Sequence, residues 1–452
     1  MPSLLTSLDP ATGDVVGEVP ITDAADVAGM VVRARAAQPS WRALGLAGRQ
    51  ALLARGLAAL AEDHERIGAL LCREMGKPLS DAVAEVRSCG HASQLDEIAT
   101  ALAPEVIQDE RTHTVLHRDP LGVVAVITPW NFPVMMPHIL ALPALMAGNT
   151  VVLKPSEETP LVAQAWADAL SVALPPYVFA VLHGDEEQGR ALVQADVNLI
   201  AFTGSRAAGA QIQTAAGPQL KRVLLELGGK DPMVVLADAD VEEAAQFAVR
   251  NSFRNAGQVC VSTERIYVAT PIAAQFEERV VALAGGLVVG SGLRSDTDVG
   301  PMINAHQKAH VVDQVQRAVK RGAQLRLSGE DRGGNWLAPT VLTGVDHSMS
   351  IMRDETFGPV ACIMRFTDVE EAVALANDTP YGLGAVVFGA PEPAEVVARR
   401  LDAGMVGVNR SVGGASGSPW VGAKQSGVGF HSGPEGHRQF TQARIVSRPL
   451  AR

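Results

Sequence analysis

Hydrophobic residues near the start of the chain recur with the period of a helix. The apolar positions that set this period are Leu52, Leu53, Leu57, Leu60, Ile67, Leu70 and Leu71. Their spacing predicts one long helix over residues 47–75, which Gly76 and Pro78 would end. A second helix is predicted over residues 80–101.

Farther along the chain, short apolar runs alternate with helical stretches. The first series of runs covers residues 123–127, 150–153, 178–182 and 199–202, with helical patterns up to Gly148 and near 160–172. A second series covers residues 232–236 and 265–269 around a helix at 240–251, and continues past 354–366. Strands that alternate with helices indicate βαβ units on parallel sheets. We therefore predict an α/β fold with two such units and a cleft between them that holds the chemistry.

Three segments lie outside these two series. Residues 108–118 and 441–449 alternate weakly between apolar and polar side chains, which predicts strands outside either core. Residues 411–418 are rich in Gly and Ser and are predicted to form a mobile loop.

Composition and charge narrow the class of protein. A chain of 452 residues is too long for one ordinary core, so two or three domains are expected. The net charge of −11 argues against nucleic acid and anionic membranes as partners. A small anionic substrate is still compatible with this net charge, because an arginine at the binding site can attract an anion despite the negative charge of the whole protein.

The cysteines and the apolar stretches indicate the compartment. Cys72, Cys89, Cys260 and Cys362 are scattered, which favours a reducing cytoplasm over a disulfide framework. The first residues show no secretory signal, and the apolar stretch 134–146 is too short to span a bilayer. The prediction is therefore a cytoplasmic protein without a membrane partner.

Three short motifs carry the chemistry. Cys260 lies in Gly-Gln-Val-Cys-Val, Glu226 opens Glu-Leu-Gly-Gly-Lys, and Asn131 lies in Thr-Pro-Trp-Asn-Phe-Pro. A thiol attacks carbonyl carbon, a carboxylate activates water, and an amide donates to an oxyanion. Alone, each has a plainer interpretation: a buried core cysteine, a solvated strand end and a helix cap. Together they are the parts of a covalent acyl-enzyme mechanism.

These motifs, in this order, strongly resemble the aldehyde dehydrogenase superfamily, and the resemblance covers nearly the whole chain. It implies that Cys260 is the nucleophile that forms a thiohemiacetal and then a thioester, and that Glu226 is the general base for hydrolysis. It also implies that Asn131 and the backbone N–H of Cys260 steady the oxyanion.

The same resemblance implies an architecture. A Rossmann-type NAD-binding domain would comprise residues 1–106 and 119–226, and a second α/β catalytic domain residues 227–425. Residues 107–118 and 426–452 would form a small β flap for oligomerisation, giving a homodimer or homotetramer.

Several residues are predicted to hold a cofactor. Lys154 and Glu157 follow a predicted strand, and a carboxylate near the ribose favours NAD over NADP. Gly204 and Ser205 lie in a strand-to-helix turn that can present N–H groups to a pyrophosphate, although neighbouring Arg206 would tolerate NADP. By resemblance, the nicotinamide end is contacted by Trp130, Leu227, Glu355 and Phe357. NAD is the predicted cofactor, with NADP as the alternative.

Arg254, six residues before Cys260, is the clue to the substrate. An arginine here resembles the succinate semialdehyde dehydrogenases, where it binds the distal carboxylate, whereas the plainer interpretation is a solvated surface arginine. The second arginine of that subfamily appears here as Ile139, beside His138, and Arg410 is the candidate substitute.

The prediction is an enzyme that oxidises a small aldehyde with an anionic tail, such as succinate semialdehyde, to its acid. A coenzyme A-acylating semialdehyde dehydrogenase is the first alternative, and Glu226 argues against it. A non-catalytic nucleotide-binding protein is disfavoured by the three intact motifs, and a cysteine hydrolase by the lack of a histidine near Cys260 in sequence. His306 and His310 stand four apart without the metalloprotease glutamate, so they predict a polar helix face and no metal site.

Overall fold

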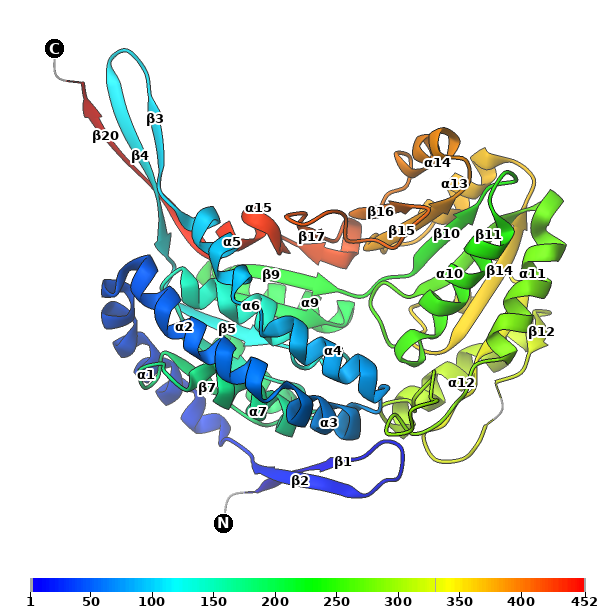
Figure 1. The fold of residues 1–452 in the computed structure, drawn as a ribbon, viewed down its shortest axis with the longest axis horizontal. Coiled ribbons are helices and arrows are strands. Elements are labelled where there is room, and N and C mark those ends of the chain that lie inside the picture. Colours follow the sequence, from blue (N-terminus) through cyan, green and yellow to red (C-terminus); the bar gives the residue numbers. More distant parts are fainter. Residues whose placement is uncertain (1–2, 330, 451–452) are drawn as a thin grey trace.

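The computed structural model describes residues 3–329 and 331–450 and contains two large parallel-rich sheets (Figure 1). The first sheet has the strand order β18-β9-β8-β5-β6-β7, in which β18 is antiparallel to β9 and the others run parallel. Its strands are β5 (Val123–Ile127), β6 (Thr150–Lys154), β7 (Phe179–Val181), β8 (Leu199–Gly204), β9 (Arg222–Leu227) and β18 (Gly427–Val428).

Both faces of this sheet are covered by helices, which is why its central strands read as unbroken apolar runs. Val124 and Val126 of β5 pack in one core with the helices α2 to α7, whereas Val123 and Ala125 pack on the opposite face with α1, α8 and α9. Successive residues of a strand point to opposite faces, so one strand serves both cores. The helices are α1 (Ala24–Ala43), α2 (Gly45–Glu62), α3 (His64–Met75), α4 (Leu79–Cys89), α5 (Ser93–Leu102), α6 (Met135–Met146), α7 (Pro160–Ser171), α8 (Glu186–Gln194) and α9 (Arg206–Ala216).

Both long helices predicted near the start of the chain are wrong, because each is broken. The first divides into α2 and α3 at Asp63, whose backbone leaves the helical region at φ −105° and ψ 9° and whose carboxylate accepts from Arg66. The second divides into α4 and α5 around Gly90. A side chain at Gly90 would lie 3.1 Å from Ala61, so glycine lets the end of α4 approach α2 closely.

The second sheet has the strand order β12-β13-β14-β11-β10-β15-β16 and one hydrophobic core. Its strands are β10 (Asp231–Val235), β11 (Thr263–Ala269), β12 (Gln324–Leu327), β13 (Thr340–Thr343), β14 (Val360–Phe366), β15 (Gly384–Phe388) and β16 (Met405–Val408). The helices packed with them are α10 (Val241–Phe253), α11 (Thr270–Gly285), α12 (Ala305–Lys320), α13 (Val369–Asn377) and α14 (Pro391–Ala398). The predicted α/β class with two series is confirmed, while the residue boundaries of the domains stay predictions.

Short strands complete the fold. β3 (Glu105–Gln108), β4 (Thr112–Pro120) and β20 (Thr441–Pro449) form a three-stranded sheet that stands away from the body of the molecule (Figure 1). The predicted flap strands therefore exist and pair with each other. Two ribbons are formed by β1 (Leu4–Leu8) with β2 (Val15–Pro20) and by β17 (Trp420–Val421) with β19 (Phe430–His431). α15 (Gly433–Arg438) follows β19.

Residues 411–418 contain turns and bends and no helix or strand, as predicted for a loop; their mobility stays a prediction. Over the described ranges, no helix is both long and apolar enough to cross a membrane.

Candidate active site

A cavity of about 240 Å³ brings the three predicted catalytic residues together. Asn131, Glu226 and Cys260 all line it, although they come from three distant parts of the sequence. Glu226 is in β9 of the first sheet and Cys260 precedes β11 of the second, so the cavity lies where the two α/β units meet.

The turn before Cys260 has an unusual backbone. Asn255, Ala256 and Gly257 have φ values of 54°, 56° and 71°, in the left-handed region that favours glycine. A Cβ at Gly257 would lie 2.0 Å from the carbonyl oxygen of Gly358, so only glycine fits. This turn ends α10 and leaves Cys260 partly exposed, whereas the other three cysteines are buried.

The surroundings of the Cys260 thiol favour its protonated form. Burial, followed by the nearby carboxylates of Glu226 and Asp231, raises the pKa of Cys260 well above its ordinary value. Attack as a thiolate therefore requires that the proton leave the cavity first.

Asn131 is held by its side chain against the Cys260 turn. Its Nδ2 donates to the carbonyl oxygen of Gln258 at 3.1 Å. It does not cap α6, whose first amides donate instead to Glu85 Oε1. Glu85 also forms a buried ion pair with Lys77 (2.5 Å), and Lys77 Nζ donates to the backbone oxygen of Asn131 at 2.8 Å. The plainer interpretation of Asn131 as a helix cap is therefore wrong.

Glu226 is buried near the end of β9, so its plainer interpretation as a solvated strand end is also wrong. Desolvation raises the pKa of Glu226 to about 7, which confirms the expectation of a carboxyl group near neutrality. Trp420 Nε1 donates to Glu226 Oε1 at 3.2 Å. Within the described ranges, Glu226 Oε2 has no hydrogen-bond partner.

The backbone after Glu226 passes directly beside Cys260. A Cβ at Gly229 would lie 2.6 Å from the carbonyl oxygen of Cys260, and one at Gly228 would lie 2.3 Å from the carboxylate oxygens of Glu355. Gly229 therefore allows the segment after β9 to approach the Cys260 turn, and Gly228 allows it to approach Glu355.

A second cavity, of about 600 Å³, lies beyond the carboxyl ends of β5, β6 and β8. Lys154 and Glu157 line it and form an ion pair at 2.9 Å. Its lining also includes Trp130, Thr203 and Gly204, which line the Cys260 cavity as well. A long ligand can therefore occupy the larger cavity and reach Cys260 with one end.

These residues fit a dinucleotide. The volume is in the usual range for cofactor sites, at the edge of a parallel sheet where such ligands bind. Two buried hydroxyls that line this cavity, of Thr128 and Thr203, have no hydrogen-bond partner in the described part of the chain. Ser205 caps α9 by accepting from the Ala208 amide at 3.2 Å, and Ala208, in the first turn of α9, lines the cavity.

The remaining predicted cofactor residues lie on the Cys260 side. Leu227, Ser205, Glu355 and Phe357 line the smaller cavity, where the rings of Trp130 and Phe357 meet edge to face at 5.6 Å. Arg206 is placed elsewhere: it donates to Gln425 at 2.8 Å and lies over the Tyr381 ring. The argument that Arg206 accommodates NADP is therefore not supported.

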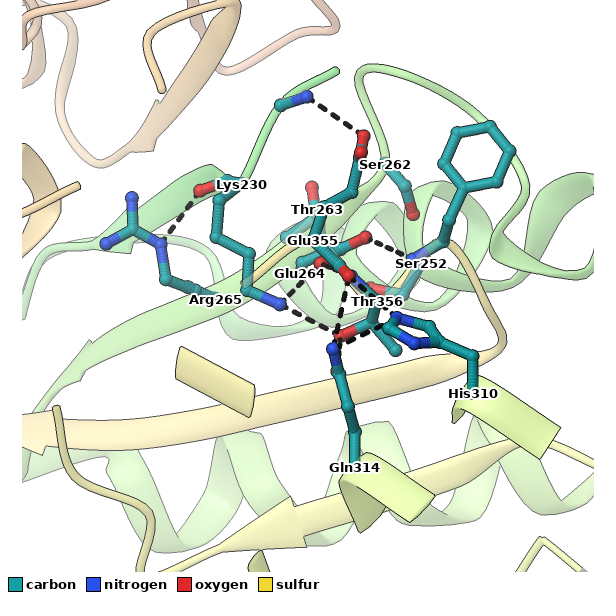
Figure 2. A network of polar contacts seen from close by, with 12 residues as sticks. Lys230, Ser252, Ser262, Thr263, Glu264, Arg265, His310, Gln314, Glu355 and Thr356 are labelled. Atoms are coloured by element: carbon teal, nitrogen blue, oxygen red, sulfur yellow. Dashed lines mark hydrogen bonds and ion pairs between the residues drawn. The ribbon is translucent and has the colours of Figure 1, made fainter. Parts of the chain in front are cut away.

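A buried polar network, which the motifs did not reveal, holds the segment of Glu355 and Phe357 (Figure 2). Glu264 accepts the backbone N–H groups of Thr356 and Phe357, both at 2.8 Å, and forms an ion pair with Lys230. Lys230 Nζ also donates to Thr356 Oγ1 at 2.9 Å. The sequence feature that could have indicated this network is the pair of charged residues, Glu264 and Arg265, at the start of an apolar strand.

Helix α12 supports the same segment from the other side. Gln314 donates to the Glu355 carbonyl at 3.2 Å, and Gln307 donates to the Phe357 carbonyl at 3.0 Å. His310 lines the Cys260 cavity and contacts the Glu355 carbonyl at 3.2 Å. The predicted polar helix face thus includes a cavity residue, which the sequence did not indicate.

Arg254 lies in a third cavity, of about 190 Å³, which is separated from Cys260 by the Phe132 ring. Its guanidinium carbon lies 5.6 Å from the ring centroid, and Lys77 Nζ lies 4.1 Å from it. Lys77 is neutralised by Glu85, whereas Arg254 forms no ion pair with any described residue. Arg254 is exposed, as its plainer interpretation predicted, and offers an unpaired positive charge beside the cavity wall.

The candidate for a second arginine is not found near Arg254. Arg410 is exposed and donates to the Gly414 carbonyl at 3.3 Å. Ile139 and His138 line a neighbouring cavity of about 280 Å³, and His138 bonds to Gln94 at 2.7 Å.

Comparison with known proteins gives one family. The sequence model of the Aldehyde dehydrogenase family matches residues 3–446. The chain is 38% identical to "Probable succinate-semialdehyde dehydrogenase", NADP(+), of Sinorhizobium fredii, with 97% of this chain and 91% of that protein covered. It is 35% identical to "Glutarate-semialdehyde dehydrogenase" of Pseudomonas putida, covering 97% and 93%. The crystal structure of an NAD-dependent aldehyde dehydrogenase from Sinorhizobium meliloti superposes with a TM-score of 0.94 at 35% identity, covering 100% of this chain and 92% of that one.

Proposed function

The chain belongs to the aldehyde dehydrogenase family, and on that premise we propose that it oxidises a small aldehyde with an anionic tail, such as succinate semialdehyde, to the carboxylic acid. The observation that carries this proposal is that Cys260, Glu226 and Asn131 line one cavity that connects to a dinucleotide-sized one.

The first step is attack by Cys260. Once its proton has left the cavity for solvent, the thiolate adds to the aldehyde carbon and forms a thiohemiacetal. The developing oxyanion accepts from Asn131 Nδ2, which already lies at the Cys260 turn, and from the backbone N–H of Cys260. The side chain of Asn131 donates to the Gln258 carbonyl, and its backbone oxygen accepts from Lys77. These two contacts keep the side-chain amide in place.

Trp130, Glu355 and Phe357 would hold the nicotinamide beside Cys260, where the cofactor would supply the acceptor for the hydride that leaves this carbon. A thioester on Cys260 remains, and Glu226 then takes a proton from the water that attacks it. A carboxyl group with a pKa of about 7 is suited to this role, because it is basic enough to take the proton and still largely ionised slightly above neutrality. The products are the acid and the free thiol.

The cofactor would be held by the residues of the two cavities. Lys154 and Glu157 would contact the adenosine ribose, Ser205 and the first turn of α9 the pyrophosphate, and Glu355 the nicotinamide ribose. NAD is favoured because the Glu157 carboxylate would repel a 2′-phosphate and Arg206 is turned away.

Arg254 would bind the far end of the substrate. Its free guanidinium suits a carboxylate, and Phe132 separates it from Cys260, so the two ends of a short chain would lie on either side of this ring. Both relatives are named for semialdehydes of dicarboxylic acids, succinate and glutarate, and such aldehydes carry a carboxylate.

The experiment that tests the proposal follows NADH absorbance with NAD and a panel of anionic, neutral aliphatic and aromatic aldehydes. Succinate semialdehyde should give the highest kcat/KM, and Cys260→Ala should abolish turnover. Arg254→Met should lower kcat/KM about 10- to 100-fold for the anionic aldehyde alone. Arg250→Met, an exposed arginine one helical turn earlier, is the matched control. Equal rates on neutral aldehydes would overturn the substrate class while leaving the chemistry intact.

Reaction that requires coenzyme A in addition to aldehyde would favour the acylating alternative, which Glu226 disfavours. The three-stranded flap exposes Val106, Ile107, Ile445 and Val446, which suits a homodimer or homotetramer, and light scattering after gel filtration would measure this. The four cysteines are all free, and a cytoplasmic location stays a prediction.

A further inference from the structure

The segment that contains Trp420 holds Glu226 both by its backbone and by its side chain. β18 pairs with β9 so that Gly427 lies opposite Glu226. Ser426 Oγ donates to the Gly228 carbonyl at 2.7 Å, which fastens the same segment just beyond Glu226. Trp420, six residues earlier than Ser426, donates its indole N–H to Glu226 Oε1 at 3.2 Å.

The indole ring of Trp420 packs against His431 of the neighbouring strand. In the β17–β19 ribbon it lies opposite His431, and the two rings stack with centroids 6.3 Å apart and an interplanar angle of 12°. His431 is buried, and its Nδ1 bonds to Ser432 Oγ at 2.9 Å. Burial lowers the pKa of His431 to about 3, so the ring beneath the indole is neutral at any working pH.

We propose that Trp420 is a positioning residue for hydrolysis of the thioester, because its N–H fixes one carboxylate oxygen of Glu226 and leaves the other, Oε2, as the basic atom. This inference rests on the proposed role of Glu226 as general base. A phenylalanine ring in place of Trp420 would have no donor for the carboxylate.

The geometry gives the expected effect of losing the donor. A hydrogen bond to the ionised carboxylate favours the charged form, and the Trp420 contact is the first of the contacts that lower the pKa of Glu226 against its burial. In Trp420→Phe the ring is kept and the donor is removed. The acidic limb of the pH profile of kcat should then move up by about one pH unit, and kcat at pH 7 should fall about fivefold.

Other titratable groups share the cavity. The charges of Cys260 and Glu355 interact with the charge of Glu226. His310 lines the same cavity from α12, and β8 contributes the uncharged Thr203. The Glu226→Gln variant separates their contributions, because the limb that disappears in it belongs to Glu226.

The experiment measures kcat, KM and the pre-steady-state burst of NADH between pH 5.5 and 9 for wild type, Trp420→Phe, Glu226→Gln and the double variant. The burst reports formation of the thioester, whereas kcat after the burst reports its hydrolysis. We expect Trp420→Phe to leave the burst rate and the aldehyde KM within twofold and to shift only the limb of kcat. In the Glu226→Gln background the same substitution should change nothing. Trp336→Phe, in a loop that lines neither cavity, is the matched control.

Two outcomes would overturn the inference: an unshifted pH profile in Trp420→Phe, or a raised KM with an unshifted profile, which would make Trp420 a wall of the substrate path. Failure of the base itself looks different, because Glu226→Gln would then keep its steady-state turnover. If thermal melting shows that Trp420→Phe is unfolded, Trp420→Leu also lacks the donor and is measured in its place.

Discussion

The side-chain amide of Asn131 donates a hydrogen bond to the backbone carbonyl of Gln258 at 3.1 Å. Asn131 follows β5 of the six-stranded sheet, while Gln258 stands two residues before Cys260 in the other α/β unit. This bond therefore joins the two units at the point where the oxyanion would form.

Replacing Asn131 by Ala should lower kcat about 100- to 1000-fold, because a pre-positioned oxyanion donor is lost. The fold should survive, since the backbone bond from Lys77 to residue 131 needs no side chain at that position. Steady-state kinetics with a thermal melt would measure both. A loss of kcat smaller than tenfold would show that Asn131 is not the donor.

Replacing Glu226 by Gln should stabilise the protein above neutral pH. The folded-state pKa of about 7 is raised from 4.5 by burial, so ionisation costs stability as pH rises from below 4.5 through 7. The neutral amide avoids this cost, which is at most about 3 kcal/mol.

Chemical denaturation at pH 5 and pH 8 would measure this effect. The gain of Glu226→Gln over wild type should be about 3 kcal/mol at pH 8 and below about 1 kcal/mol at pH 5. Glu278→Gln on the exposed face of α11 is the control and should show no such difference. A pH-independent gain would contradict the raised pKa.

Replacing Glu157 by Gln should relax the choice of cofactor. The carboxylate lines the larger cavity beside Lys154, where it would repel a 2′-phosphate. Without that charge, Lys154 is free to pair with the phosphate, so kcat/KM for NADP relative to NAD should rise about tenfold. Initial rates with each cofactor would measure the ratio, and an unchanged ratio would place the ribose elsewhere.

Replacing Glu264 by Gln should loosen the segment of Glu355 and Phe357. Lys230 would be left as a buried unpaired charge, which costs about 3–5 kcal/mol. Because Glu264 also accepts the amides of Thr356 and Phe357, the Kd for NAD should rise, as fluorescence titration would show. The double variant Lys230→Met with Glu264→Gln should recover part of the stability but not the affinity. Full recovery of affinity would contradict a role in positioning.

Local patterns predicted the regular elements well where burial was uniform. The strands at β5, β6 and β8 were predicted because helices cover both faces and every residue between must be apolar. The helix breaks at Asp63 and Gly90 were missed, because the apolar period continues through both. They depend on how α2, α3 and α4 pack, and a one-dimensional pattern does not contain that packing.

The residues of the candidate site likewise divide into those that local motifs reveal and those that only the packing reveals. Cys260, Glu226 and Asn131 were chosen from motifs, and the fold places them in one cavity. Glu264, Gln314 and His310 were not chosen, because each acts through contacts with a segment 41 to 92 residues away. The hydrogen bond from Trp420 to Glu226 spans 194 residues and has no signature in sequence.

The sequence by itself determined the family, the α/β class and the chemical groups, because apolar periodicity and short motifs are local properties of a chain. The tertiary structure decided what those groups can do: it buried Glu226, raised its pKa, turned Arg206 away from the nucleotide cavity and set Arg254 beside Phe132. The physical reason is that desolvation and hydrogen bonding depend on distances between residues far apart in sequence, and these exist only once both sheets have packed.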